Sequence, residues 1–486
     1  MRIISVITML LSVDAIPTSG MAQSAGPQSW ELQMLAQQLA VPTGPQTVQH
    51  APRMIPRMGI SRDSTGELAT FQPNGRTKAT SNPYFQVLGT NGRSCFTCHQ
   101  EKTGWTVSAA SVQKRFAKSN GTDPIFRLVD GATCSNDDVS SLSARRQAYS
   151  LLLSKGLIRI ALPLPDSSIL EFQVTSVNDP YNCTTNPATG LTSPTTGLVS
   201  AYRRPLPSTN LGFLSTIMSD GREPSLASQA IDATLGHAQA MSAPTSAQVQ
   251  QIVDFESGLF TAQLFDKRAR LLDRKGATGG PKALSKQNFF IGINDPFGNN
   301  PTGAPFSSQI FDLYEAWQSL PGNGRVARAR ESVARGEQLF DTTPINITNV
   351  AGINDVTGQA VFHGFCGTCH DTPNVGDHSV KAPLNIGVVD PNPPGLDNSD
   401  LPVFTLQCTS GPLAGQTFVT TDIGRAMITG KCADIGKFKG PILRGLAARA
   451  PYFHNGSAAT LMDVVSFYNQ RFGIGFTDQQ KQDLVN

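Results

Sequence analysis

The sequence lacks a strong charge of either sign and is poor in charged residues altogether. Its 39 Lys and Arg nearly balance 36 Asp and Glu, which leaves a net charge of +3, and charged residues make up only 15% of the chain. Such a balance creates no field that would hold a nucleic acid or an anionic membrane surface. We therefore expect neither partner.

Long apolar runs are also missing. The run from Ile3 to Val13 is shorter than the roughly 18 residues that a membrane span needs, and no later segment reaches that length. The run follows Arg2 and precedes small residues around Ala22 to Ala25, which is the layout of a secretory signal. A membrane anchor is the alternative. We predict a cleaved signal peptide over residues 1–24 and a periplasmic protein without a membrane span.

The eight cysteines fall into two groups. Four form two CxxCH segments, in which paired thiols can form thioethers with haem vinyl groups while the adjacent imidazole reaches the iron. From this composition, about 0.002 such segments are expected by chance. The segments comprise Cys95, Cys98 and His99, and Cys366, Cys369 and His370.

A zinc site built from the four paired thiols is the alternative to haem. It would not require a His after each pair, and an oxidising compartment favours haem attachment over reduced zinc thiolates. We therefore predict two covalently bound haem c groups. For the other four cysteines, we predict disulfides Cys134–Cys183 and Cys408–Cys432, although the sequence cannot prove this connectivity.

Hydrophobic periodicity predicts a mainly α fold with long loops, consistent with 44 Gly and 33 Pro. Each half holds one CxxCH segment, which indicates two cytochrome c-like haem domains. Residues 157–162 and 170–175 read as a small β-hairpin insert. We expect an extended arm over 25–84, an N-terminal haem c domain over 85–325 with its insert at about 120–205, and a C-terminal haem c domain over 326–486.

Individual helices are predicted from the same periodicity and from capping patterns. One of them carries Leu461, Val464, Val465 and Tyr468 on a single stripe. The predicted helices are 30–39, 140–154, 224–240, 245–272, 306–320, 327–340 and 460–468.

The order of the two CxxCH segments and the motifs between and after them resembles that of bacterial di-haem cytochrome c peroxidases and their MauG-like relatives. The resemblance extends over roughly residues 85–486. It implies that hydrogen peroxide is reduced to water with electrons from a small donor such as a c-type cytochrome. The motifs between and after the haem segments are Ser219-Asp220-Gly221-Arg222 with Leu226 and Gln229, Leu443-Arg444, and Ala450-Pro451-Tyr452-Phe453-His454-Asn455-Gly456-Ser457 with Thr460-Leu461.

The resemblance implies that His99 and His370 are the proximal iron ligands. It also implies a Gln and, ten residues later, an acid on the open face of the first haem. Those positions hold Gln229 and Gln239, so the acid is missing. An amide can orient peroxide but cannot relay a proton near neutral pH. Both could instead be solvent-facing helix amides.

His237 precedes Gln239 by two residues. On a continuous helix this offset turns the side chain about 200° away, so His237 can replace the acid only if Gly236 ends the helix. No His occurs between His99 and His237, and the first iron is then expected to be five-coordinate.

Fourteen residues after His454 the resemblance implies the second ligand of the C-terminal haem, which here is Tyr468. A tyrosinate ligand would lower the potential of that haem, whereas a Met would raise it. Tyr468 could instead be a core tyrosine on its helix stripe. His454 is expected either to bridge the haems or to serve as a structural histidine in a turn.

Two further positions depart from the family. Ser219 stands where a Trp lies between the haems, so electrons would pass through Trp105, Phe213 or Trp317, or pass more slowly. The family also holds a calcium ion between its haem domains. Arg449 and Pro451 occupy the carbonyl positions, but Arg204 replaces the expected Asn side chain, so the sequence leaves calcium open.

Three functions remain open. The first is a di-haem peroxidase. The second is a MauG-like or rubber-oxygenase-like oxidase that acts on a protein or organic substrate, which Tyr468 and the missing acid favour. The third is a non-enzymatic electron-transfer protein.

Overall fold

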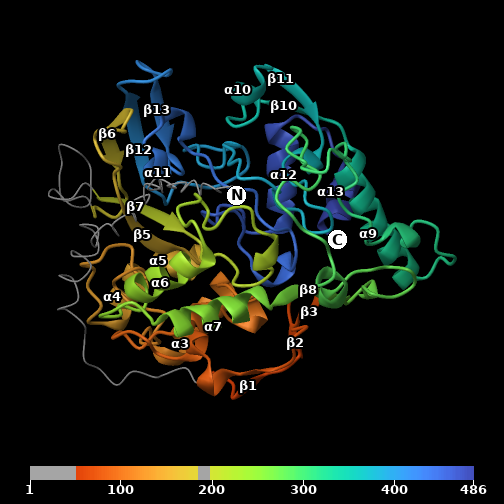
Figure 1. Cartoon of the computed structure of the whole chain (residues 1–486), viewed down its shortest axis with the longest axis horizontal. Helices are drawn as coiled ribbons and strands as arrows, with labels where there is room; N and C mark the ends of the chain where they lie inside the picture. The colour runs from red at the N-terminus through yellow and green to blue at the C-terminus, as the bar shows by residue number, and fades with distance from the viewer. Residues whose placement is uncertain (1–50, 184–197) are drawn as a thin grey trace, which may run out of the picture.

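The computed structural model describes residues 51–183 and 198–486 (Figure 1). The predicted signal peptide and the helix expected over 30–39 lie outside these residues. In the described part, no helix is both long enough and apolar enough to cross a bilayer. The helices are α2 (Cys95–Cys98), α3 (Ala109–Ser119), α4 (Leu142–Ala148), α5 (Ser150–Lys155), α6 (Leu226–Gly236), α7 (Ser246–Ser257), α8 (Pro281–Leu284), α9 (Arg325–Thr342), α10 (Asn354–Thr357), α11 (Ala426–Thr429), α12 (Leu461–Arg471) and α13 (Asp478–Val485).

The structure has more short strands than a mainly α fold would have. The predicted fold class is therefore confirmed only in part. They form a four-stranded sheet of order β2-β3-β8-β9, a three-stranded sheet β13-β12-β6, and the pairs β1-β4, β5-β7 and β10-β11. The strands are β1 (Met54–Ile55), β2 (Met58–Arg62), β3 (Gly66–Phe71), β4 (Thr77–Lys78), β5 (Ile158–Pro163), β6 (Phe172–Asn178), β7 (Leu198–Arg203), β8 (Phe260–Asp266), β9 (Arg270–Leu271), β10 (Ile345–Thr348), β11 (Val361–Gly364), β12 (Val403–Cys408) and β13 (Thr417–Thr420).

The described part of the predicted arm is built into a sheet. Strand β3 lies between β2 and β8, and Leu68 and Ala69 on it are almost completely buried. The helix predicted over 245–272 is wrong beyond Ser257, because the chain turns at Gly258 and continues as β8. Aromatic and β-branched residues at the start of β8 favour a strand, and pairing with β3 satisfies its backbone.

The helix predicted over 306–320 is also absent; the segment has only a 3-10 turn at Glu315–Trp317. Two carboxylates of α9 bind its backbone instead. Glu337 accepts hydrogen bonds from the N–H groups of Leu313 and Tyr314, and Asp341 accepts one from Ile310. Side chains of a distant helix therefore replace the local hydrogen bonds that a helix would have made.

The predicted hairpin insert contains strands at the expected places, but they do not pair with each other. Strand β5 pairs with β7, and β6 pairs with β12 of the C-terminal half, as seen at the upper left of Figure 1. A shared apolar core that includes Leu162, Phe172 and Leu406 holds them together. Both predicted disulfides are present, Cys134–Cys183 and Cys408–Cys432.

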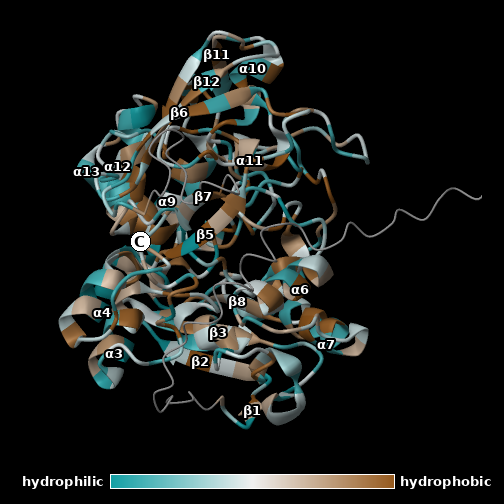
Figure 2. Cartoon of the chain, turned by 90° about the vertical axis from the view of Figure 1, so that its left-hand side faces the viewer, coloured by the Kyte–Doolittle hydropathy of each residue, from teal (hydrophilic) through white to brown (hydrophobic). Residues whose placement is uncertain are grey.

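The C-terminal half is organised around α9, which closely matches its predicted span. It packs on α13, which also contacts α12 (Figure 1). Helices α9 and α13 approach each other closely at Gly336, where a Cβ atom would lie 2.1 Å from the backbone oxygen of Asp483. Figure 2 shows hydrophilic and hydrophobic residues side by side on α12 and α13, as expected for helices with one buried face.

Candidate haem-binding site

The two CxxCH segments are held by the same local device. Cys95 and Cys98 span one turn of helix, where the N–H of Ser94 donates to the Oγ1 of Thr97 at 3.0 Å. In the second segment, the N–H of Phe365 donates to the Oγ1 of Thr368, also at 3.0 Å. A threonine before the second cysteine thus fixes the turn that brings each thiol pair together.

Each histidine after a cysteine pair is oriented by a backbone carbonyl. The Nδ1 of His99 lies 2.9 Å from the carbonyl oxygen of Trp105, and that of His370 lies 2.6 Å from the carbonyl oxygen of Gly376. Nδ1 must carry the proton in such a bond, so Nε2 is the atom left to bind iron. Burial lowers the pKa of both imidazoles to about 4, which keeps them in the neutral form that binds metal.

Both segments open onto one cavity of about 1250 Å³. Sites for a single small molecule are usually about 300–1,000 Å³, so this cavity suits two large groups better than one. Its lining includes both histidines and all four paired cysteines, none of which forms a disulfide. Thiols, imidazoles and cavity together fit two covalently attached haems.

The structure places a histidine at the first site where the resemblance expected an acid. Helix α6 ends at Gly236, and the N–H of His237 closes its last turn on Ala233. His237 and Gln229 both line the cavity. Gln239 is not among the lining residues. It has a positive φ of 55°, and its Oε1 accepts a hydrogen bond from the amide of Asn91. This position does not support a role for Gln239 on the open face.

His237 is fixed by Asp130, a residue that the sequence did not single out. The Nδ1 of His237 lies 2.7 Å from Oδ2 of Asp130, and an Arg93 nitrogen lies 2.6 Å from its Oδ1. Burial alone would raise the pKa of Asp130, but Arg93 and His237 outweigh it and lower the pKa to about 2. Arg93, two residues before Cys95, could have been suspected; nothing in the sequence marked Asp130.

At the second site, Tyr468 faces the cysteine pair. It lies on α12, lines the cavity and packs against Phe453 and Phe472. Burial raises the pKa of Tyr468 well above its usual value, and the nearby Cys369 and Cys366 thiols act in the same direction. The phenol is therefore within electrostatic reach of the second haem-attachment segment. That it binds iron remains a prediction.

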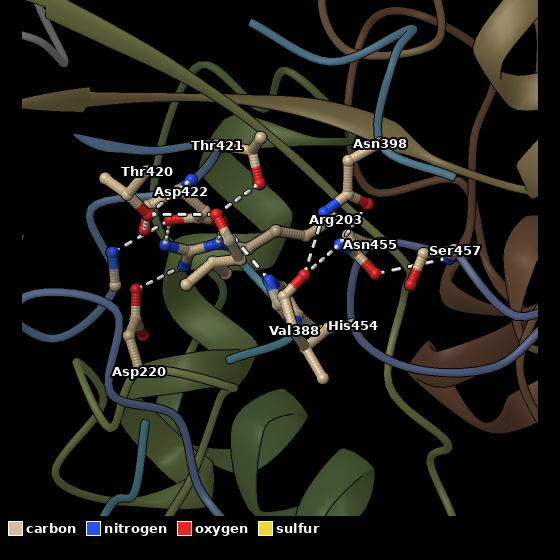
Figure 3. A network of polar contacts seen from close by, with 12 residues as sticks. Arg203, Asp220, Val388, Asn398, Thr420, Thr421, Asp422, His454, Asn455 and Ser457 are labelled. Carbon is tan, nitrogen blue, oxygen red and sulfur yellow. Dashed lines mark hydrogen bonds and ion pairs between the residues drawn. The ribbon is translucent and has the colours of Figure 1, made fainter. Parts of the chain in front are cut away.

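A buried ion network joins the two halves of the chain beside the cavity (Figure 3). Arg203 of β7 forms ion pairs with Asp220 and Asp422, and all three side chains are almost fully enclosed. Burial alone would lower the pKa of Arg203, but the two carboxylates raise it. The Asp-Gly-Arg motif thus places a carboxylate that binds an arginine of the insert, together with one from the C-terminal half.

His454 lies next to this network and lines the cavity. Its ring stacks on Phe438 at 3.8 Å between centroids, and its Nε2 lies 3.8 Å from Oδ2 of Asp422. That nitrogen has no hydrogen-bond partner among the described residues. Burial lowers the pKa of His454 to about 4. Of the aromatic residues suggested for electron passage, Trp105, Phe213 and Trp317 do not line the cavity, whereas Phe438 does.

The expected calcium position contains cationic side chains. Burial lowers the pKa of Arg204 to about 9, and repulsion from Arg449 adds to the effect. The backbone N–H of Arg204 also donates to the carbonyl of His454, next to Pro451. Two guanidinium groups close enough to repel each other disfavour a further cation between them. These residues do not fit calcium.

The sequence is similar to known haem proteins over parts of its length. The model of the RoxA-like, cytochrome c-like family matches residues 437–472. The cytochrome-c peroxidase IdrP2 of Denitromonas iodatirespirans is 38% identical over 139 residues, which cover 26% of this chain and 36% of that protein. IdrP1 of Pseudomonas sp. (strain SCT), also a cytochrome-c peroxidase, is 37% identical over 196 residues, covering 37% of this chain and 50% of that protein.

A structural neighbour is a MauG-like protein associated with microbial copper homeostasis, with 18% identity and a TM-score of 0.30. The match covers 59% of this chain and 72% of that one, and similarity this low does not establish a shared fold. The chain spans about a third to a half of the length of the curated relatives it matches. Together with the two haem-attachment segments, these partial sequence matches support the resemblance to bacterial di-haem cytochrome c peroxidases.

Proposed function

We propose that this protein is a periplasmic peroxidase that reduces hydrogen peroxide to water. Peroxide reacts at the first haem site, and the second haem receives electrons from a small donor protein such as a c-type cytochrome. Similarity to proteins named cytochrome-c peroxidases supports the reaction type. The two disulfides support an oxidising compartment such as the periplasm.

The observation that carries the proposal is the difference between two haem-attachment segments on one cavity. Both present a neutral histidine to the iron position. The first site has Gln229 and His237 on its cavity wall, whereas the second has Tyr468 beside its cysteines. Hydrogen-bonding groups suit a site that binds a small polar oxidant, whereas a phenol that ligated iron would close the second site to peroxide.

The overall reaction consumes one H₂O₂, two electrons and two protons and releases two molecules of water. Haem iron, when bound, supplies the redox chemistry that breaks the O–O bond. The amide of Gln229 orients peroxide by hydrogen bonds. The stacked rings of Phe438 and His454, which both line the cavity, are our candidates for the path of the electrons.

The test is steady-state turnover of the haem-loaded protein with a reduced c-type cytochrome as donor. We expect two cytochrome molecules to be oxidised for each peroxide consumed, with no oxidation when peroxide is left out. Absence of peroxide-dependent cytochrome oxidation, with several cytochromes of different charge, would exclude the peroxidase function.

A second candidate is an oxidase that uses peroxide or dioxygen to attack a protein or an organic polymer. The RoxA-like match over residues 437–472 and the tyrosine at 468 favour it. A tyrosine-ligated second haem of low potential would be a poor acceptor for electrons from a c-type cytochrome. Oxidation of an added organic substrate without any cytochrome donor would select this function over the first.

A further inference from the structure

The first site lacks a carboxylate where the resemblance expects the group that moves a proton during peroxide cleavage. Gln229 and Gln239 are amides, which cannot accept a proton near neutral pH. His237 is the titratable side chain that the end of α6 brings to this wall of the cavity. We propose that His237 is the proton acceptor of the first haem site and that Asp130 positions it; the inference rests on the proposed peroxidase function.

The geometry leaves one nitrogen of His237 available. Nδ1 lies 2.7 Å from Oδ2 of Asp130, which is ionised beside Arg93, so Nδ1 carries the proton and Nε2 has a free lone pair. Asp130 is held in turn, because its Oδ1 and Oδ2 both accept hydrogen bonds from Arg93.

The surroundings of His237 differ from those of a structural histidine. Its side chain retains 39% of its accessible surface and lines the cavity, whereas the Asp130 side chain retains only 5%. His237 is also close enough to His99 to contribute to the lowering of that residue's pKa. One nitrogen of the imidazole is thus anchored by Asp130, while the side chain borders the same cavity as His99.

The proton transfer balances without any further reagent. Nε2 of His237 takes the proton from one oxygen of H₂O₂ and returns it to the other oxygen as the O–O bond breaks. The second oxygen then leaves as water, and His237 is neutral again. Two electrons from the donor and two protons from solvent complete the second water. Positioned general acid–base groups of this kind accelerate a reaction by about 10²–10⁴-fold.

Besides Asp130, four acids line the cavity, and of these Glu256 is the one that acts electrostatically on a cysteine of the first segment; the four are Glu256, Asp266, Glu337 and Asp483. Glu256 is 4% exposed, its Oε2 has no hydrogen-bond partner among the described residues, and burial raises its pKa to about 7. It acts electrostatically on Cys95 and Tyr84, whereas Asp130 acts on Cys98. Glu256 and the Asp130–His237 pair are therefore associated with different cysteines of the first segment, and substitutions can separate their roles.

The experiment compares H237Q, H237A, E256Q and the control H363Q, which changes an exposed histidine on β11. Each haem-loaded protein is mixed rapidly with peroxide and, separately, with cyanide, which binds ferric haem only after HCN loses its proton. We expect H237Q to slow both reactions at least about 100-fold, with an unchanged ferric spectrum. Added imidazole should restore part of the rate in H237A, and E256Q and H363Q should react like the parent protein.

Asp130 is tested by a double-mutant cycle on the cyanide rate. D130N should slow cyanide binding in the parent protein but add nothing in the H237Q background, because it acts through His237. If Asp130 were merely structural, D130N would slow cyanide binding equally in the parent protein and in H237Q. That result would show that Asp130 does not act through His237.

Two results would overturn the role of His237. One is an unchanged cyanide rate in H237Q. The other is conversion of a six-coordinate haem into a five-coordinate one in H237Q, which would make His237 an iron ligand. If the parent protein consumes no peroxide but H237Q still slows cyanide binding, the peroxidase function is excluded. The role of His237 as a proton acceptor would then still be supported.

Discussion

The two haem sites share their attachment but differ in what faces it. Each has a threonine that fixes the turn of its cysteine pair and a carbonyl that orients its histidine. The difference arises on the helices opposite. His237 lies at the C-cap of α6 and lines the cavity beside the first segment, whereas Tyr468 lies within α12 and lines it beside the second. The two haem sites therefore face different side chains, a histidine at a helix end and a tyrosine within a helix.

Removal of the covalent attachment at one site is expected to have the largest effect. C95A/C98A should lose the mass of one haem and all reaction with peroxide. C366A/C369A should lose the same mass but keep a single reaction with peroxide, while donor-supported turnover disappears. Intact mass and stopped-flow absorption measure both effects. If the second double variant were the one inert toward peroxide, the roles of the two sites would be reversed.

Y468F changes only the second haem site and tests whether Tyr468 binds its iron. Losing a phenolate ligand should alter the spectrum of the second haem and raise its potential. Donor-supported turnover should rise, because a haem of higher potential accepts electrons from a c-type cytochrome more readily. Redox titration and paramagnetic resonance report the change. Y202F, at a buried tyrosine bonded to the carbonyl of Thr133, serves as the control and should leave both haem spectra unchanged.

R203A tests the buried ion network that joins the two halves of the chain. It leaves Asp220 and Asp422 buried without their shared partner, which should reduce the free energy of unfolding by about 3–5 kcal/mol. Urea unfolding of the haem-loaded protein measures it. K481A removes an ion pair with the fully exposed Asp478 and should leave the transition midpoint almost unchanged. Equal effects of the two substitutions would mean that the buried network adds no stability.

The smallest effect is expected from chelation. Because the guanidinium groups of Arg204 and Arg449 repel each other and would also repel a further cation, treatment with EGTA should leave turnover and both haem spectra unchanged. Loss of activity that is restored by added calcium would show that a cation is bound elsewhere.

Much of the site could be predicted from the sequence because its signals are local. A CxxCH segment specifies both thioether positions and the proximal histidine within five residues. The stripe of α12 predicted that Tyr468 faces inward, and it does line the cavity, although Phe467 is the residue of that helix that is fully buried. The sequence also named a break at Gly236 as the condition for His237 to enter the site. The structure satisfies that condition.

The parts that failed depend on contacts between distant segments. Strand β6 pairs with β12, more than two hundred residues away, and periodicity carries no information on such partners. The segment 306–320 lost its helix to the carboxylates of Glu337 and Asp341, which belong to another helix. Asp130 and Phe438 reach the cavity by tertiary packing, and no sequence motif marked them.

A cyanide titration of the ferric protein, followed by absorption and related to its haem content, tests most directly whether the two sites differ. We expect two covalently bound haems in each chain and a single bound cyanide, at the haem attached to Cys95 and Cys98. Cyanide on both haems, or on neither, would contradict the claim that one iron is open and the other is closed.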